Sequence, residues 1–61
     1  MPGLYDLMDE VMATELGVDL NTYIHVIEDL CTLEEADFII DNMWQEDGDI
    51  DAAKQLFQSK L

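Results

Sequence analysis

Three aspartates around a glycine are the first residues in this chain that could bind a ligand. The segment 47–51 reads Asp-Gly-Asp-Ile-Asp, and a twelve-residue calcium-binding loop has a glycine at position six and an aliphatic residue at position eight. With the glycine at position six, positions one, three and twelve are Met43, Gln45 and Lys54, none of which is a carboxylate. We therefore expect no calcium site, and predict instead a helix-ending glycine followed by an aspartate that caps the next helix.

The histidine, cysteine and serine that most often serve as bases, metal ligands or nucleophiles occur once each, as His25, Cys31 and Ser59. One histidine and one cysteine cannot supply the four ligands of a structural zinc site. The chain also has no arginine to hold a phosphate or a carboxylate. We expect no enzyme activity, no catalytic residue, no metal and no cofactor, with His25 at the surface and Cys31 as a small core residue.

The charge of the chain limits the kinds of molecule that it can bind. Fifteen acidic residues and two lysines give a formal net charge of -13 at pH 7. Both lysines lie in the last eight residues, so the first 53 contain neither lysine nor arginine. A polyanion of this kind repels nucleic acids and anionic membranes. We expect its partner to be a basic surface of another protein, with no direct nucleic acid and no membrane.

The N-terminus and the single cysteine bear on the compartment. Residues 1–10 combine Met-Pro-Gly with three acids, unlike the basic start and apolar run of a signal peptide. No apolar stretch approaches the roughly 20 residues of a membrane span. One cysteine cannot form an internal disulfide, which fits a reducing environment. The sequence predicts a protein that is cytoplasmic or otherwise intracellular.

Apolar residues recur at three- and four-residue spacing in four segments, which is typical of amphipathic helices. The predicted helices span residues 4–16, 20–30, 33–46 and 50–60, within one domain of residues 1–61. Their expected apolar faces are Leu4, Leu7, Met8, Val11, Met12 and Leu16; Leu20, Ile24, Ile27, Leu30 and Cys31; Leu33, Ala36, Ile39, Ile40, Met43 and Trp44; and Ile50, Ala53, Leu56, Phe57 and Leu61. Strand patterns are absent. The predicted fold class is all-α, a small bundle of four short helices.

Local signals mark several helix ends. Gly17 can adopt the left-handed conformation that ends a helix. Thr32 and Glu35 form a capping box, in which each side chain accepts a hydrogen bond from the other residue's backbone N–H. Asp49 can cap the last helix, and Lys60 lies where a cation stabilises the C-terminal end of the helix dipole. These signals predict where three of the helices begin or end.

Seven aromatic and methionine side chains are candidates for contact with a partner: Tyr5, Phe38, Trp44, Phe57, Met8, Met12 and Met43. Most of them are expected in the core. Phe38 is the exception, because segment 38–40 places three apolar residues in a row and a helix of a small bundle rarely buries all three. We expect one of the three to lie at the edge of the core.

The entry to the last predicted helix follows a family pattern. After Gly48 come an aspartate, an aliphatic residue and small alanines, followed by the large apolar pair Leu56 and Phe57. Fifteen residues separate the glycine from Thr32. In these respects residues 19–61 resemble a three-helix ubiquitin-associated (UBA) or CUE domain, although the turn at Thr32 lacks the Met-Gly-Phe or Phe-Pro motif of those families. The resemblance implies a three-helix fold, with the first helix as an addition, and binding of ubiquitin.

We expect a non-enzymatic, acidic helical module that docks on a basic surface of a partner protein. In the first version, the resemblance implies recognition of ubiquitin or of a similar small protein. The positions that match the family's contact residues are Leu30, Thr32, Leu56 and Phe57, and Phe38 at the core edge is a further candidate. A few apolar anchors would then carry the binding energy, while charge complementarity raises the association rate.

In the second version, the carboxylates take the place of nucleic-acid phosphates. The chain would then inhibit a DNA-binding or RNA-binding protein or a polymerase, as some phage-encoded inhibitors do. Asp6, Asp9 and Glu10 are expected on one solvent-facing side of the first helix and would carry this contact. A third version is a fragment or small subunit of a larger assembly, buried against a basic neighbour.

Overall fold

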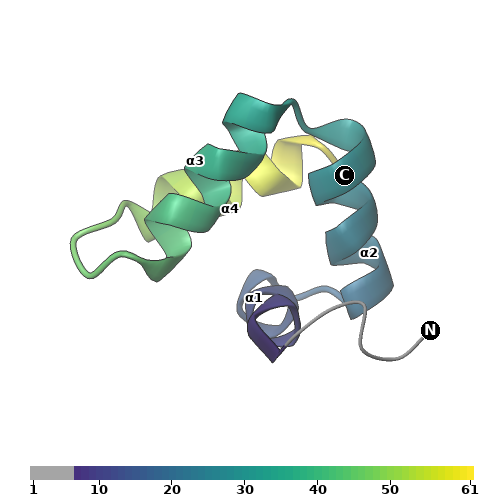
Figure 1. Ribbon diagram of the computed structural model, residues 1–61, viewed down its shortest axis with the longest axis horizontal. Helices are drawn as coiled ribbons and strands as arrows, with labels where there is room; N and C mark the ends of the chain where they lie inside the picture. Colours follow the sequence, from purple (N-terminus) through teal and green to yellow (C-terminus); the bar gives the residue numbers. More distant parts are fainter. Residues whose placement is uncertain (1–6) are drawn as a thin grey trace.

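Four helices account for most of the chain described by the computed structural model, which covers residues 7–61 (Figure 1). They are α1 (Leu7–Leu16), α2 (Leu20–His25), which continues as the wider helix η1 (Val26–Leu30), α3 (Leu33–Trp44) and α4 (Ile50–Ser59). Residues 7–61 contain no strand. The predicted all-α bundle of four short helices is confirmed, and the part of the first predicted helix before Leu7 lies outside the described residues.

The helices associate as two pairs. α1 packs mainly against α2, and α3 forms a hairpin with α4 whose connecting loop extends away from the first pair (Figure 1). The aromatic rings of Tyr23 in α2 and Phe57 in α4 stack with their centroids 6.2 Å apart and their planes 19° from parallel. This ring contact joins the two pairs through the centre of the molecule.

The core draws residues from every helix. Its buried members are Met12, Ala13 and Leu16 of α1, Tyr23 and Val26 of the second helix, Ile39 of α3, and Ala53 and Phe57 of α4. Complete burial of one large apolar side chain contributes about 1.5–3 kcal/mol. Because a domain of this size retains only about 3–5 kcal/mol of net stability, each of the large members accounts for a substantial part of it.

The predicted apolar face of α1 is wrong along one edge. Met12 and Leu16 are buried as expected, but Leu7, Met8 and Val11 are exposed, and Ala13 is buried in their place. The reason is that α1 packs mainly against α2 and makes few contacts with α3 and α4. An apolar edge of α1 is therefore left at the surface.

The second helix also buries a face that differs from the predicted one. Tyr23 and Val26 are buried, although neither belongs to the predicted apolar stripe. Residues of that stripe flank them and are half-buried: Leu20, Ile24, Ile27 and Cys31. The backbone N–H of Cys31 donates to the carbonyl of Val26 five residues earlier, at 3.0 Å. This wider turn interrupts regular helical spacing, and Leu30 becomes exposed.

The predicted caps of α3 and α4 are confirmed. The Thr32 side chain accepts from the backbone N–H of Glu35 at 3.1 Å, and the Glu35 carboxylate accepts from the backbone N–H of Thr32 at 2.9 Å. The Asp49 side chain accepts from the backbone N–H of Ala52 at 3.1 Å. Gly17 has a φ of 77°, the left-handed conformation expected of a helix-ending glycine.

The end of α3 corrects the prediction. The helix ends at Trp44, with Gln45 as its C-cap, so Gly48 lies in the loop and is not the residue that ends the helix. Gly48 instead packs on the backbone of Asn42, where an added Cβ would lie 2.5 Å from the Asn42 carbonyl oxygen. The Asn42 side chain also accepts from the backbone N–H of Asp49 at 2.9 Å. Asn42 therefore holds the loop back against α3.

Candidate protein-interaction surface

The acidic residues remain at the surface. Among residues 7–61 no polar or charged residue is buried. Folding therefore concentrates the negative charge on the outside of a molecule whose longest dimension is 33 Å. Such a surface attracts cationic partners and repels other polyanions.

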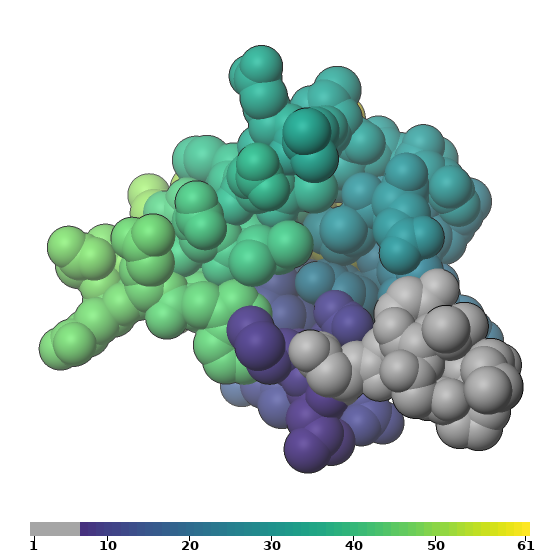
Figure 2. Space-filling view, viewed as in Figure 1, coloured from purple at the N-terminus to yellow at the C-terminus, as the bar shows by residue number. Residues whose placement is uncertain are grey.

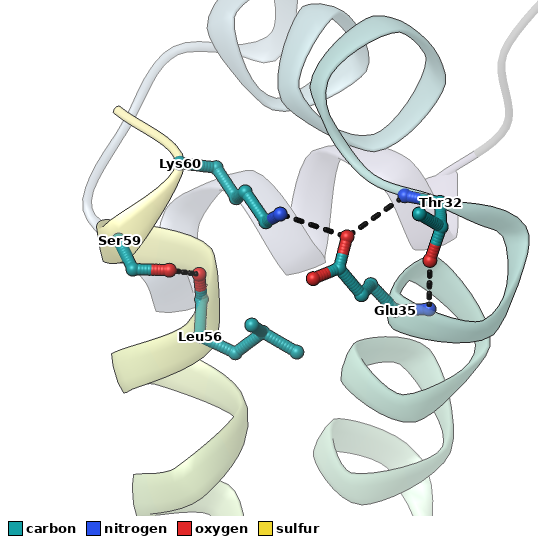
Figure 3. Close-up of polar contacts among 5 residues, drawn as sticks. All are labelled: Thr32, Glu35, Leu56, Ser59 and Lys60. Atoms are coloured by element: carbon teal, nitrogen blue, oxygen red, sulfur yellow. Dashed lines mark hydrogen bonds and ion pairs between the residues drawn. The ribbon is translucent and has the colours of Figure 1, made fainter.

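One of the two lysines is committed to an internal contact (Figure 3). The ammonium of Lys60 lies 2.8 Å from a carboxylate oxygen of Glu35, and the two side chains are 25% and 29% exposed. The same Glu35 oxygen accepts the Thr32 backbone N–H of the capping box. Lys60 does lie at the end of α4, as predicted, but its charge is directed to the start of α3. This contact ties the C-terminal end of α4 to the turn at Thr32.

Hydrogen bonds from the Lys60 ammonium and the Thr32 backbone N–H hold the pKa of the Glu35 carboxyl below its usual value of 4.5. A carboxyl whose pKa is lowered by folding stabilises the folded state above its unfolded pKa. That stabilisation is lost as the pH falls below about 4.5 and passes through the lowered pKa.

Replacing Glu35 with glutamine is therefore expected to lower the melting temperature at pH 7 and to have a smaller effect at pH 3. Glutamine can still accept from the Thr32 backbone N–H, but it has no charge for Lys60. Glu34→Gln is the matched control, since it removes the same charge one position away. The comparison is the melting temperature of Glu35→Gln minus that of Glu34→Gln. An equally large difference at pH 7 and pH 3 would contradict the link between the Glu35 charge and stability.

An apolar groove lies between α1 and the α3–α4 turn. It is lined by Val11, Met12, Glu15, Met43, Trp44 and Ile50 and has a volume of about 240 Å³. Figure 2 shows α1 next to the end of α3 on this face of the molecule. We call this feature the α1–α3 groove. Clefts that enclose drug-sized ligands usually measure about 300–1,000 Å³, so this groove suits a side chain of a partner better than a free metabolite.

A shallower hollow adjoins the groove along α1. It has a volume of about 340 Å³ and shares Val11 and Glu15 with the groove, while Leu7, Glu10 and Thr14 complete its lining. The exposed edge of α1 therefore continues the apolar surface of the groove. Glu10 and Glu15 place carboxylates beside it.

The sites predicted by family resemblance differ in exposure. Leu30, Thr32 and Phe38 are exposed and Leu56 is half-buried, with its side chain extending from α4 toward α3 (Figure 3). Phe57 is fully buried in the core, so its assignment to the contact surface is wrong. The ring contact with Tyr23 accounts for this burial. In segment 38–40, Ile39 is buried, Ile40 is half-buried against the core and Phe38 is exposed. The expectation that one of the three lies at the core edge is therefore met by Ile40, not by Phe38.

The exposure of the acids assigned to the first helix can be compared with the prediction for two of the three. Asp6 lies outside the described residues. Glu10 is exposed and Asp9 is half-buried. The two described acids therefore differ in their access to solvent, and the predicted single acidic side of this helix is not a uniform surface.

The reactive side chains form no cluster. His25 is exposed, with its Nδ1 atom 2.9 Å from a carboxylate oxygen of Asp29 in the next turn. Cys31 is half-buried against the core, where burial and then the Glu35 carboxylate raise the pKa of its thiol. Within residues 7–61 no group of three or more histidine, cysteine or acidic residues is placed to hold a metal ion.

Three comparisons with other proteins found nothing similar to the chain. No protein-family model matches it, and no curated protein or solved structure does so either. The resemblance to UBA and CUE domains thus stays a prediction that rests on residues 48–57 and on their spacing from Thr32. In addition, no helix within residues 7–61 is long and apolar enough to cross a bilayer.

Part of the groove does not follow from the sequence. The sequence makes Met43 and Trp44 contact candidates that are expected mostly in the core, whereas it assigns Val11 and Ile50 only to helix faces. Val11 is 44% exposed and Ile50 is 45% exposed. Ile50 directly follows the Asp49 cap, and its place in the first turn of α4, with acids on both sides, could have indicated an exposed position.

Proposed function

We propose that this chain is a non-enzymatic, acidic helical module that binds a basic surface of another protein. The observation that carries the proposal is the combination of a net charge of -13 with the absence of any buried charged residue among residues 7–61. One lysine is already paired with Glu35, so the chain neutralises little of its own charge. A cationic partner supplies the missing countercharge and gains a fast, steered association.

Affinity capture with the purified chain tests this proposal. The captured protein is expected to have an excess of lysine and arginine and to elute between about 0.1 and 1 M salt, as the Debye length falls from roughly 10 to 3 Å. Glu34, Asp37 and Asp41 are exposed, so changing them to their amides removes three charges without touching the core. This variant is expected to elute earlier. A partner with no basic surface, or equal elution of the variant, would contradict the proposal.

Recognition of ubiquitin is the specific version that one structural observation favours. The bond between Lys60 and Glu35 brings the end of α4 to the turn at Thr32. The family resemblance assigns partner contacts to these two places, through Leu30 and Thr32 on one side and Leu56 on the other. The two groups of contact positions therefore lie at the same end of the α3–α4 pair, and this common location supports the ubiquitin version.

Titration of the isotopically labelled chain with ubiquitin decides on this version. We expect the backbone amide resonances of Leu30, Thr32 and Leu56 to shift with increasing ubiquitin and those of the α1–α3 groove to stay in place. A nucleic-acid mimic would instead give no response to ubiquitin and a complex with its target that dissociates by about 0.5 M salt, since charge alone holds it.

A further inference from the structure

The α1–α3 groove exposes large apolar side chains that no part of residues 7–61 covers. Val11, Trp44 and Ile50 are 44%, 41% and 45% exposed although they lie together around one hollow. Met12 forms its floor, since it also belongs to the buried core. Contiguous exposed apolar surface on a small soluble protein commonly marks an interaction site.

Carboxylates border this apolar surface. Glu15 lines both the groove and the adjoining hollow, and Glu10 lines the hollow. Ile50 is preceded by Asp49 and followed by Asp51. Neither lysine lines the groove or the hollow. The surroundings therefore favour an occupant that is apolar in the middle and positive at its edges.

Two other occupants fit these observations less well. A second copy of this chain would bring another charge of -13 against the same surface, where repulsion opposes association. A small metabolite would find a hollow of about 240 Å³ that offers a single charged side chain, Glu15. A side chain from a larger, cationic molecule fits both the size and the charge.

We propose that the α1–α3 groove binds a positively charged, amphipathic peptide segment of a partner protein. A large apolar side chain of that segment inserts between Val11, Trp44 and Ile50, and its lysines or arginines face Glu10 and Glu15. The inference rests on the proposed function and names the surface and the chemistry of its partner. It differs from the ubiquitin version, which uses Leu30, Thr32 and Leu56.

Trp44 provides the measurement, because it is the only tryptophan in the chain and lines the groove. The probe is a synthetic 14-residue peptide of leucine and lysine, which becomes amphipathic as a helix and contains no tryptophan. A scrambled peptide of identical composition keeps the charge but has no apolar face. We expect the amphipathic peptide to shift the Trp44 emission to shorter wavelength and to bind at least about tenfold more tightly than the scrambled one.

Two groove variants, Val11→Ser and Ile50→Ser, are each expected to weaken binding of the amphipathic peptide by about tenfold, the loss for one aliphatic contact. Both positions are partly exposed, so the helical signal should persist. Leu33→Ser is the matched control, because Leu33 is also an exposed aliphatic residue that begins a helix. It lies at the other end of α3 from Trp44, roughly 16 Å away along the helix at 1.5 Å per residue. The Leu33→Ser variant should bind the amphipathic peptide as tightly as the wild type does.

The charge contribution is tested in the same way. Glu15→Gln is expected to weaken binding more than Glu34→Gln, which removes the same charge away from the groove. The groove inference is overturned if Glu15→Gln weakens peptide binding no more than Glu34→Gln and Ile50→Ser weakens it no more than Leu33→Ser. The proposed function would remain intact in that case.

A shift of Trp44 emission with protein concentration alone would also overturn the groove inference, because a second copy would then fill the groove. If neither basic peptide binds even at low salt, the proposed function itself is contradicted.

Discussion

Replacing Phe57 with alanine is expected to abolish the folded state at room temperature. Phe57 is fully buried, and its ring stacks on Tyr23 to join the two helix pairs. A buried phenylalanine changed to alanine costs about 3–5 kcal/mol, through lost burial and the cavity that remains. A single core in a chain of this size supplies about the same net stability. Far-ultraviolet circular dichroism and urea unfolding measure the result.

The second phenylalanine is the control for this experiment. Phe38 is 42% exposed, so Phe38→Ala removes the same side chain from the surface and should keep a cooperative urea transition. Phe57→Leu, which retains much of the volume, should give an intermediate loss of stability. A Phe57→Ala protein with a urea midpoint near that of the wild type would show that the ring contact is not central to the fold.

The starts of the last two helices could be predicted because they depend on local chemistry. The capping box of Thr32 needs only a glutamate three residues later, and the Asp49 cap needs only the backbone amide of Ala52. Gly17 likewise ends α1 through its own φ angle. Each of these features involves residues close together in sequence, so no knowledge of the tertiary structure was required.

The buried faces of α1 and α2 could not be predicted to the same degree. Periodicity shows which residues are apolar, but the position of the neighbouring helix decides which of them are covered. Val11 belongs to the same predicted apolar face as Met12 and Leu16, yet it remains exposed because α1 makes few contacts with α3 and α4. Tyr23 lies beside the stripe that periodicity predicts, and only the tertiary structure brings its ring against Phe57.

The α1–α3 groove is a tertiary feature for the same reason. Val11 and Ile50 are far apart in the sequence and meet only through the packing of the two helix pairs. The charge that surrounds the groove could be predicted from composition. Its location could not, because nothing in the local sequence of α1 indicates that the end of α3 lies beside it.

Replacing Gly48 with alanine is expected to destabilise the chain by about 1–3 kcal/mol, the usual cost of forcing extra volume into a close contact. The added Cβ would lie 2.5 Å from the carbonyl oxygen of Asn42 and 2.9 Å from its Cα atom. Those atoms belong to the backbone of α3 and cannot rotate away. The loop must therefore move off the helix, which also stretches the bond from the Asp49 N–H to the Asn42 side chain. Thermal and urea unfolding measure this loss.

Comparing Gly48→Ala with Gly17→Ala separates the effect of a crowded Cβ from the effect of a strained φ angle. At Gly17 a Cβ would meet nothing within 4 Å, but the φ of 77° is left-handed, and an alanine there costs roughly 1–2 kcal/mol for that reason. The two variants can therefore lose similar stability, but only Gly48→Ala should also change the Trp44 emission of the folded protein. The loop that Gly48 holds against α3 connects Trp44 to Ile50, two residues that line the groove. An unchanged emission in Gly48→Ala would show that the groove keeps its shape without this contact.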